Sequence, residues 1–109
     1  MAITYKVLAQ SAPSATTNTD VYTVGAGKQA TISTITVANR SGTSATYRIA
    51  VRPNGDTLAN EHYIAYDVTL SGNDTIALTL GITVDASDVI TVYASTANTT
   101  FNIFGAEIA

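Results

Sequence analysis

The sequence predicts an all-β domain, an antiparallel β-sandwich or jelly roll of about eight strands. Short runs rich in Val, Ile, Thr and Tyr recur along the chain, as strands require. Clusters of Gly, Asn, Asp, Ser and Pro separate these runs at intervals of about 8–12 residues. No stretch of helical length repeats its apolar residues with a helical period. The length of 109 residues predicts a single domain, 1–109.

The predicted strands follow one another along the chain with turn residues between them. They span residues 3–8, 20–24, 29–38, 45–52, 62–70, 75–80, 89–95 and 99–108. In most of them apolar residues alternate with polar ones, so one face of each strand is expected to be buried. A polar stretch at 9–19, which contains Pro13, is predicted to be a loop or an arm. Residues 57–61 are predicted to be a loop or one short helical turn.

The longest run, 29–38, breaks its alternation once. Its apolar residues step from Ile32 to Ile35, so the buried face changes between them. A β-bulge near Ser33 or Thr34 would restore the alternation. A strand buried on both sides is the alternative interpretation.

The alternating faces also predict the core, because two packed sheets bury one face of each strand. We expect the following side chains to be mostly buried: Ile32, Tyr47, Ile49, Val51, Ile64, Val68, Ile76, Leu78, Ile90, Val92 and Ile103. On the 62–70 strand, Ile64, Tyr66, Val68 and Leu70 are predicted to share one face.

The composition excludes several classes of function. The five basic residues form no run, so no nucleic-acid partner is expected. No segment has the apolar length of a membrane span, and the N-terminus lacks the pattern of a signal peptide, so synthesis in a cytoplasm without membrane insertion is expected. The chain has no Cys, which excludes disulfides and thiolate metal sites.

The surface is expected to carry little charge. Charged residues make up 12% of the chain, about half the usual share of roughly 25%. Thr, Ser, Ala and Asn take their place, which suits a surface that packs against neighbouring subunits. A soluble β domain that is simply rich in Thr is the alternative.

No catalytic, cofactor-binding or metal-binding residues are predicted, so the chain is not expected to be an enzyme. His62 is the single histidine, no Gly-x-Ser-x-Gly motif accompanies it, and we expect it near the surface at the start of a strand. Asp85 and Asp88 flank Ala-Ser and are predicted to bind nearby backbone N–H groups in a turn. A calcium site is the alternative, but it would need more oxygen ligands.

A predicted subunit interface comprises Arg48, Arg52, Asp67 and Tyr63. The two arginines share a strand face, and Asp67 would lie opposite one of them if the 45–52 and 62–70 strands pair. In the interface interpretation the arginines face a neighbouring subunit, since Arg is enriched at interfaces. In the alternative, one of them pairs with Asp67 within the chain. The six tyrosines could instead form a sugar-binding face, although the absence of Trp weakens that reading.

The chain resembles small virion structural proteins of tailed bacteriophages over nearly its whole length. The runs that carry the resemblance are YKVL at 5–8, AP at 12–13, VYTV at 21–24, ITVANR at 35–40, YRIAVRP at 47–53 and FNIFG at 101–105. The resemblance implies a capsid cement or decoration protein in the virion, made in the host cytoplasm, with the major capsid protein or other virion proteins as partners. A neck, tail or fibre component and a carbohydrate- or receptor-binding module are the alternatives.

We also expect a homo-oligomer, with a trimer favoured. Low surface charge and a small core make added burial useful. A trimer would match the threefold positions of an icosahedral shell. The segment up to Thr19 is the predicted arm that reaches a neighbour.

Overall fold

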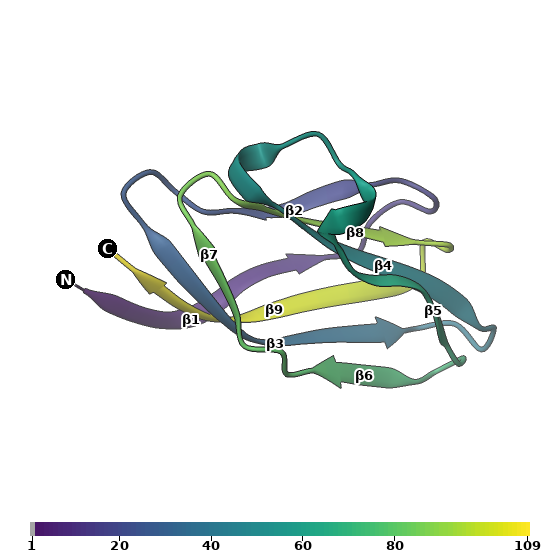
Figure 1. Ribbon diagram of the computed structural model, residues 1–109. Helices are drawn as coiled ribbons and strands as arrows, with labels where there is room; N and C mark the ends of the chain where they lie inside the picture. The colour runs from purple at the N-terminus through teal and green to yellow at the C-terminus, as the bar shows by residue number, and fades with distance from the viewer. Residues whose placement is uncertain (1) are drawn as a thin grey trace.

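Across residues 2–109, which the computed structural model describes, nine strands form two antiparallel sheets packed face to face (Figure 1). The strands are β1 (Ile3–Ser11), β2 (Thr19–Thr23), β3 (Gln29–Asn39), β4 (Ala45–Arg52), β5 (Tyr63–Leu70), β6 (Thr75–Leu78), β7 (Ile82–Asp85), β8 (Val89–Ala94) and β9 (Thr99–Ile108). Two 3-10 turns, η1 (Pro53–Gly55) and η2 (Asn60–His62), lie between β4 and β5. The predicted all-β sandwich is confirmed.

The strand order is that of a jelly roll. One sheet has the order β1-β9-β3-β6, with β7 on the same side of β3, and the other has the order β2-β8-β4-β5. β6 and β7 pair with successive halves of β3, so they are one edge strand interrupted at residues 79–81. Counting them as one gives eight strands in two interleaved four-stranded sheets, as in a jelly roll. The predicted 75–80 strand therefore continues, after Gly81 at φ +65°, into the unpredicted strand β7.

The predicted bulge in β3 is confirmed. The pairing of β3 with β9 shifts register between Ile32 and Thr34, which leaves Ser33 as the extra residue. The shift keeps Ile32 and Ile35 on the buried face. Opposite the bulge, β9 needs Gly105, because a Cβ there would clash with the carbonyl oxygen of Thr31.

Most of the predicted core is confirmed. Six predicted residues are fully buried between the sheets: Ile32, Tyr47, Ile49, Ile90, Val92 and Ile103. Four more are partly buried and pack against them: Val51, Val68, Ile76 and Leu78. The prediction is wrong for Ile64, which is 42% exposed.

The error at Ile64 comes from two register shifts in β5. The ladder with β4 pairs Ile49 with Ala65 but Tyr47 with Val68, so both Tyr66 and Asp67 lie opposite Arg48. Asp67 adopts a left-handed φ of +48°, which Asp tolerates better than most residues. The inward face of β5 therefore runs from Ala65 to Val68 and Leu70, and the predicted single face of Ile64, Tyr66, Val68 and Leu70 does not exist.

Two connections, 12–18 before β2 and 53–62 after β4, lie against the domain. The predicted 9–19 loop or arm is a loop only at 12–18, because 9–11 continue β1 and Thr19 begins β2. Pro13 is buried in this loop, and the N–H of Thr16 donates to the carbonyl of Ala94 at 2.8 Å. The connection 53–62 lies against β4 and β8 of the four-stranded sheet (Figure 1), and Ala50 on β4 and Thr91 on β8 are both buried.

A buried amide joins the two sheets at one end. Asn39, the last residue of β3, is 3% exposed. Its Nδ2 lies 2.8 Å from the carbonyl oxygen of Thr43 and 3.3 Å from those of Leu70 and Ser71. Its Oδ1 accepts a hydrogen bond from the N–H of Ser41 at 3.0 Å. One side chain thus links the end of β3 in one sheet to the end of β5 in the other.

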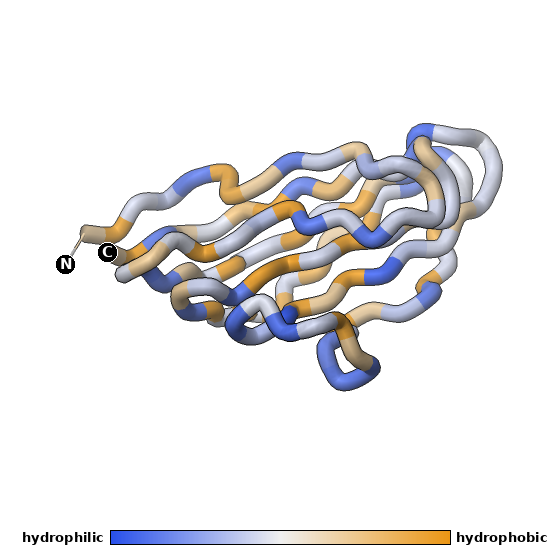
Figure 2. Tube along the Cα trace, turned by 90° about the horizontal axis from the view of Figure 1, so that it is seen from above, coloured by the Kyte–Doolittle hydropathy of each residue, from blue (hydrophilic) through white to orange (hydrophobic). Residues whose placement is uncertain are grey.

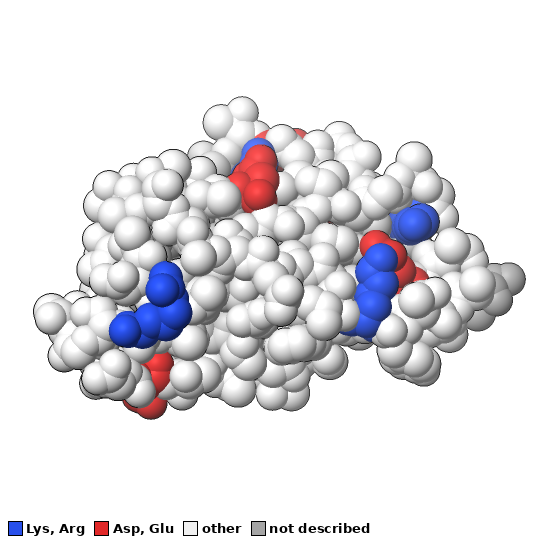
Figure 3. Space-filling model, turned by 180° about the vertical axis from the view of Figure 1, so that it is seen from behind, with Lys and Arg blue, Asp and Glu red and all other residues white. Residues whose placement is uncertain are grey.

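Apolar positions recur along the strands in Figure 2, in keeping with the alternation seen in the sequence. The face of the molecule in Figure 3 is mostly uncharged, and its few charged side chains lie in small separate groups. In the part of the chain that the structure describes, no helix has the length and apolar character needed to cross a bilayer.

Candidate functional site: a tyrosine–arginine cluster

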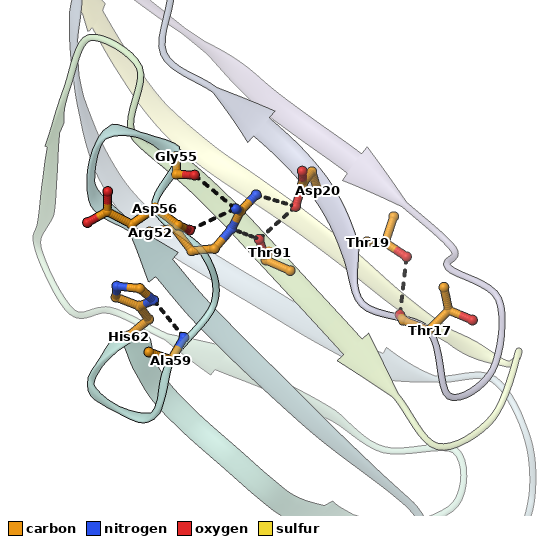
Figure 4. A network of polar contacts seen from close by, with 9 residues as sticks. All are labelled: Thr17, Thr19, Asp20, Arg52, Gly55, Asp56, Ala59, His62 and Thr91. Atoms are coloured by element: carbon orange, nitrogen blue, oxygen red, sulfur yellow. Dashed lines mark hydrogen bonds and ion pairs between the residues drawn. The ribbon is translucent and has the colours of Figure 1, made fainter.

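The single histidine has a structural role. His62 is 8% exposed, so the prediction that it lies near the surface is wrong. Its Nδ1 accepts a hydrogen bond from the N–H of Ala59 at 3.0 Å and closes the η2 turn (Figure 4). No Ser and no carboxylate is hydrogen-bonded to the imidazole among residues 2–109.

Asp85 and Asp88 bind backbone groups, as the turn interpretation predicted. Asp88 accepts hydrogen bonds from the N–H groups of Asn54 and Asp85, both at 2.8 Å. Asp85 accepts one from Ala86 at 2.8 Å. The carboxylates therefore fix the turn before β8 and attach η1 to it. Over residues 2–109, no group of three or more His, Cys, Asp or Glu side chains gathers as a metal site would require.

Arg52 stabilises the connection between β4 and β5. Its guanidinium contacts Asp20 at 2.9 Å and Thr91 at 3.0 Å. It also donates to the carbonyls of Gly55 and Asp56, at 3.3 and 2.9 Å (Figure 4). Because Thr91 donates in turn to Asp20 at 2.8 Å, one arginine joins strands β2, β4 and β8 to the 53–56 segment. These contacts occupy the guanidinium within its own domain.

Arg48 occupies a different environment, on the outer face of the four-stranded sheet. Its Nε donates to Asp67 at 2.6 Å and its Nη2 donates to the other carboxylate oxygen at 3.3 Å. The guanidinium carbon lies 4.3 Å from the ring centroid of Tyr66 and 4.2 Å from that of Tyr93. The hydrogen bonds to Asp67 raise the pKa of Arg48 above its usual range. The cation is held by a bidentate ion pair and two aromatic faces.

The register shifts in β5 build this arrangement. Tyr66 and Asp67 both lie opposite Arg48. Tyr66 therefore stacks on the guanidinium, and Asp67 forms the ion pair with it. Tyr93 is the ladder partner of Arg48 on β8. Tyr63 is paired with Ala50 and its ring packs edge-on against Tyr66, with centroids 4.8 Å apart. We call Arg48, Tyr63, Tyr66, Asp67 and Tyr93 the tyrosine–arginine cluster.

The cluster is ordered by its own contacts and still open to solvent. Tyr66 is 55% exposed, while Tyr63 and Tyr93 are half-buried. A shallow hollow lies beside it, lined by Asn60, Tyr63 and Tyr66. The cluster offers aromatic area and a guanidinium–carboxylate pair, and Asn60 adds a side-chain amide at the hollow beside it. These groups bind by stacking and hydrogen bonding.

A second ionic group lies between the two sheets near the termini. The hydroxyl of Tyr22 donates to Glu107 at 2.7 Å, and Lys6 contacts the same carboxylate at 2.8 Å. Lys6, followed by Tyr22, lowers the pKa of Glu107. Burial and the bond to Glu107 raise the pKa of Tyr22 above its usual range. These contacts fix β1 and β9 against β2.

The predicted interface residues are therefore divided. Arg48, Asp67 and Tyr63 come together, as their place on paired strands suggested, whereas Arg52 belongs to the separate network under the 53–56 segment. Sequence reasoning missed Tyr66 and Tyr93 as members. Tyr93 sits between Thr91 and Ser95 on an otherwise polar strand face, which is a signal that could have identified it.

Comparison with protein families, with curated proteins and with solved structures gives no match in any of the three.

Proposed function

We propose that this chain is a structural protein of a bacteriophage virion, a capsid cement or decoration protein that stabilises the shell. It acts by contact without catalysing a reaction. It would be made in the host cytoplasm and bind the major capsid protein or another virion protein. The observation that carries the proposal is the tyrosine–arginine cluster with its exposed Tyr66, because Tyr and Arg are enriched among the few residues that contribute most of the binding energy at protein interfaces.

Three further observations support a role in assembly. The contacts of Arg48 hold the cluster in one geometry before binding, which reduces the entropy lost when a partner docks. The jelly-roll order is common in viral capsid proteins, although it also occurs in lectins and enzymes. The sparse surface charge favours close packing of subunits.

The test uses particles of the virus that encodes the chain. We expect image reconstruction to show density for the domain on the outer shell, with the tyrosine–arginine cluster facing the capsid. Density at the neck, tail or fibres would replace the cement role by one of those structural roles. Absence of the protein from purified particles would contradict the virion proposal altogether.

Binding to particles that lack the protein tests the cluster itself. Arg48→Ala should weaken attachment at least about tenfold, which corresponds to about 1.4 kcal/mol. Lys28→Ala, which removes an exposed cation elsewhere, is the matched control and should bind like the wild type. Equal binding of both variants would exclude the cluster as the attachment surface.

A carbohydrate- or receptor-binding module is the second candidate. The hollow beside Asn60, Tyr63 and Tyr66 favours it, because aromatic rings stack on sugars and an amide can bind hydroxyl groups. A glycan array separates the two functions. A cement protein should bind nothing on the array, whereas a glycan ligand lost in Tyr66→Ala would identify a sugar site.

A further inference from the structure

β1 has a free hydrogen-bonding edge. It ends the five-stranded sheet: β9 lies on one side, and within residues 2–109 no strand pairs with it on the other. Ala2 and Ala109 exchange two backbone hydrogen bonds, both 2.9 Å long. Bonded and non-bonded pairs alternate along an antiparallel ladder, so Ile3, Tyr5 and Val7 direct their N–H and C=O groups away from β9. Three successive outward residues thus present unpaired donors and acceptors.

The side chains of the same three residues are exposed. Tyr5 is 83% exposed, and Ile3 and Val7 are each exposed by about half. Tyr5 pairs with Ala106 of β9, which in turn pairs with Thr31 of β3. Thr31 lies between the core residues Ala30 and Ile32, so its side chain and that of Tyr5 are on the outer face of the sheet. Their ladder partners on this face are apolar: Ile108, Ala106 and Phe104. We call these six residues the apolar stripe.

This edge lacks the usual protection against pairing. Exposed edge strands are normally short, bulged, charged or interrupted by Pro. Between Ile3 and Val7 the ladder is regular, and the bulge of β1 comes only after Val7. The one charge in this segment, Lys6, belongs to the opposite face and pairs with Glu107 of its own chain. Figure 2 shows β1 as an outer strand leading from the N-terminus, with orange positions along it.

We propose that a second copy of this chain pairs with β1 along this edge, antiparallel and about a two-fold axis at Tyr5. Tyr5 would face Tyr5 of the second copy, and Ile3 would face Val7. All three outward residues of each copy then form hydrogen bonds, about six in total. The apolar stripes of the two copies become one continuous surface across a joined sheet.

The edge is complementary to itself in this register. Lys6 lies opposite Thr4 of the second copy, so no like charges face each other. A register centred on Val7 would bring the bulge after Val7 into the ladder. A register centred on Ile3 would leave Val7 unpaired. A second copy is therefore the occupant that this edge fits, and the inference does not depend on the proposed virion function.

A contact along one edge strand is small beside the roughly 1,600 Å² of a standard protein interface. We therefore expect a reversible dimer whose fraction rises with concentration. An isologous contact of this kind closes after two copies. The proposed contact therefore predicts a dimer in place of the trimer expected from composition.

Sedimentation of the wild-type chain tests the proposal. We expect the mass to rise from 11.3 kDa toward twice that value between low and high micromolar concentration. Tyr5→Lys places two lysines opposite each other at the axis and should remain monomeric throughout. Ile64→Lys, an exposed apolar residue on the edge strand β5, is the matched control and should dimerise like the wild type. Circular dichroism verifies that both variants are folded.

Cysteine cross-linking tests the register, because the chain has no natural Cys. In Tyr5→Cys the two new thiols belong to a hydrogen-bonded pair with Cα atoms about 5.5 Å apart, which suits a disulfide. Under mild oxidation it should form a covalent dimer. Ile3→Cys and Val7→Cys should cross-link efficiently only when mixed, since each pairs with the other.

A wild-type chain that stays monomeric at all concentrations would overturn the proposal. Trimers, or dimers that Tyr5→Lys leaves intact, would also overturn it. Failure of Tyr5→Cys to cross-link in a sample that is dimeric by sedimentation would refute the register centred on Tyr5. None of these outcomes depends on whether the chain binds a particle.

Discussion

The two sheets end in edge strands that differ in how they meet solvent. β5 is irregular: two register shifts interrupt it, Asp67 has a left-handed backbone, and its side chains stack and pair with Arg48. The first half of β1 is regular, and the outward side chains of Ile3, Tyr5 and Val7 are exposed. Bulges and charge discourage the addition of another strand, whereas a regular apolar edge permits it.

This difference suggests that the two edge strands bind different kinds of partner. β5 presents ordered side chains that suit recognition of a different surface, because the cluster is fixed by its own ion pair and stacking. β1 presents backbone groups that suit pairing with another strand. Substitutions in the two regions should therefore change the stability of the fold to different extents.

The largest effect on stability is expected in the core next to β5, at Ile49 of β4. Ile49→Ala should lower the free energy of unfolding by about 2–5 kcal/mol, because Ile49 is fully buried and its replacement leaves a cavity. The matched variant Ile64→Ala, on the strand paired with it, should change stability by less than about 0.5 kcal/mol. Chemical denaturation measures both. Similar losses in the two variants would contradict the assignment of Ile49 to the core and Ile64 to the surface.

A smaller effect is expected in the cluster. Arg48→Ala removes the ion pair and both aromatic contacts, so stability should fall on the order of 1–2 kcal/mol. Arg48→Lys keeps the charge but loses the bidentate geometry and most of the stacking, and it should recover less than half of that loss. The measurement is the denaturation midpoint in dilute solution. If Arg48→Ala were as stable as Lys28→Ala, the cluster would not be ordered by Arg48.

A pH-dependent effect is expected on the inner side of β1. The pKa of Glu107 is lower in the folded state than in the unfolded chain, so its stabilisation is present above the usual glutamate pKa of about 4.3. It is lost as the pH falls through the lowered value. Glu107→Gln should cost on the order of 0.5–1 kcal/mol at neutral pH, and the difference from wild type should shrink in acid. A difference that is constant with pH would contradict the role of Lys6 and Tyr22.

The smallest effect is expected on the outer side of β1. Tyr5→Thr should change the stability of the dilute monomer by less than about 0.5 kcal/mol, because this ring is almost fully exposed and Thr is favourable in strands. The same substitution should weaken dimerisation. A large loss of monomer stability would show that Tyr5 belongs to the fold and would remove the contrast with Arg48.

Much of the fold could be predicted from residue alternation. The bounds of β4 and β9 were correct, and the odd step from Ile32 to Ile35 located the bulge in β3. The irregularity of β5 escaped prediction because its inward residue Ala65 is small and inconspicuous, while Ile64 and Tyr66 mimic a buried face. The extension of β1 to Ser11 depends on its long-range ladder with β9, which local residue patterns do not reveal.

The site could be predicted only in part. The pairing of Arg48 with Asp67 followed from the expected adjacency of their strands and is confirmed. The stacking of Tyr66 and Tyr93 on Arg48 depends on the register shifts and on β8 being the other neighbour of β4. Neither can be deduced from spacing along the chain. Arg52 shares a strand face with Arg48, yet in the described residues Arg52 is hydrogen-bonded to Gly55 and Asp56, whereas Arg48 is bonded to Asp67.

The amide of Asn39 affects how the molecule opens. It belongs to β3 and holds the carbonyl groups of Thr43, in the turn before β4, and of Leu70 and Ser71, at the end of β5. Fraying of either sheet at this end would leave polar groups of the other without their partners. We therefore expect local opening at this end to require separation of the two sheets. The backbone hydrogens at the ends of β3 and β5 should therefore exchange with solvent as one cooperative unit, at a rate set by global unfolding.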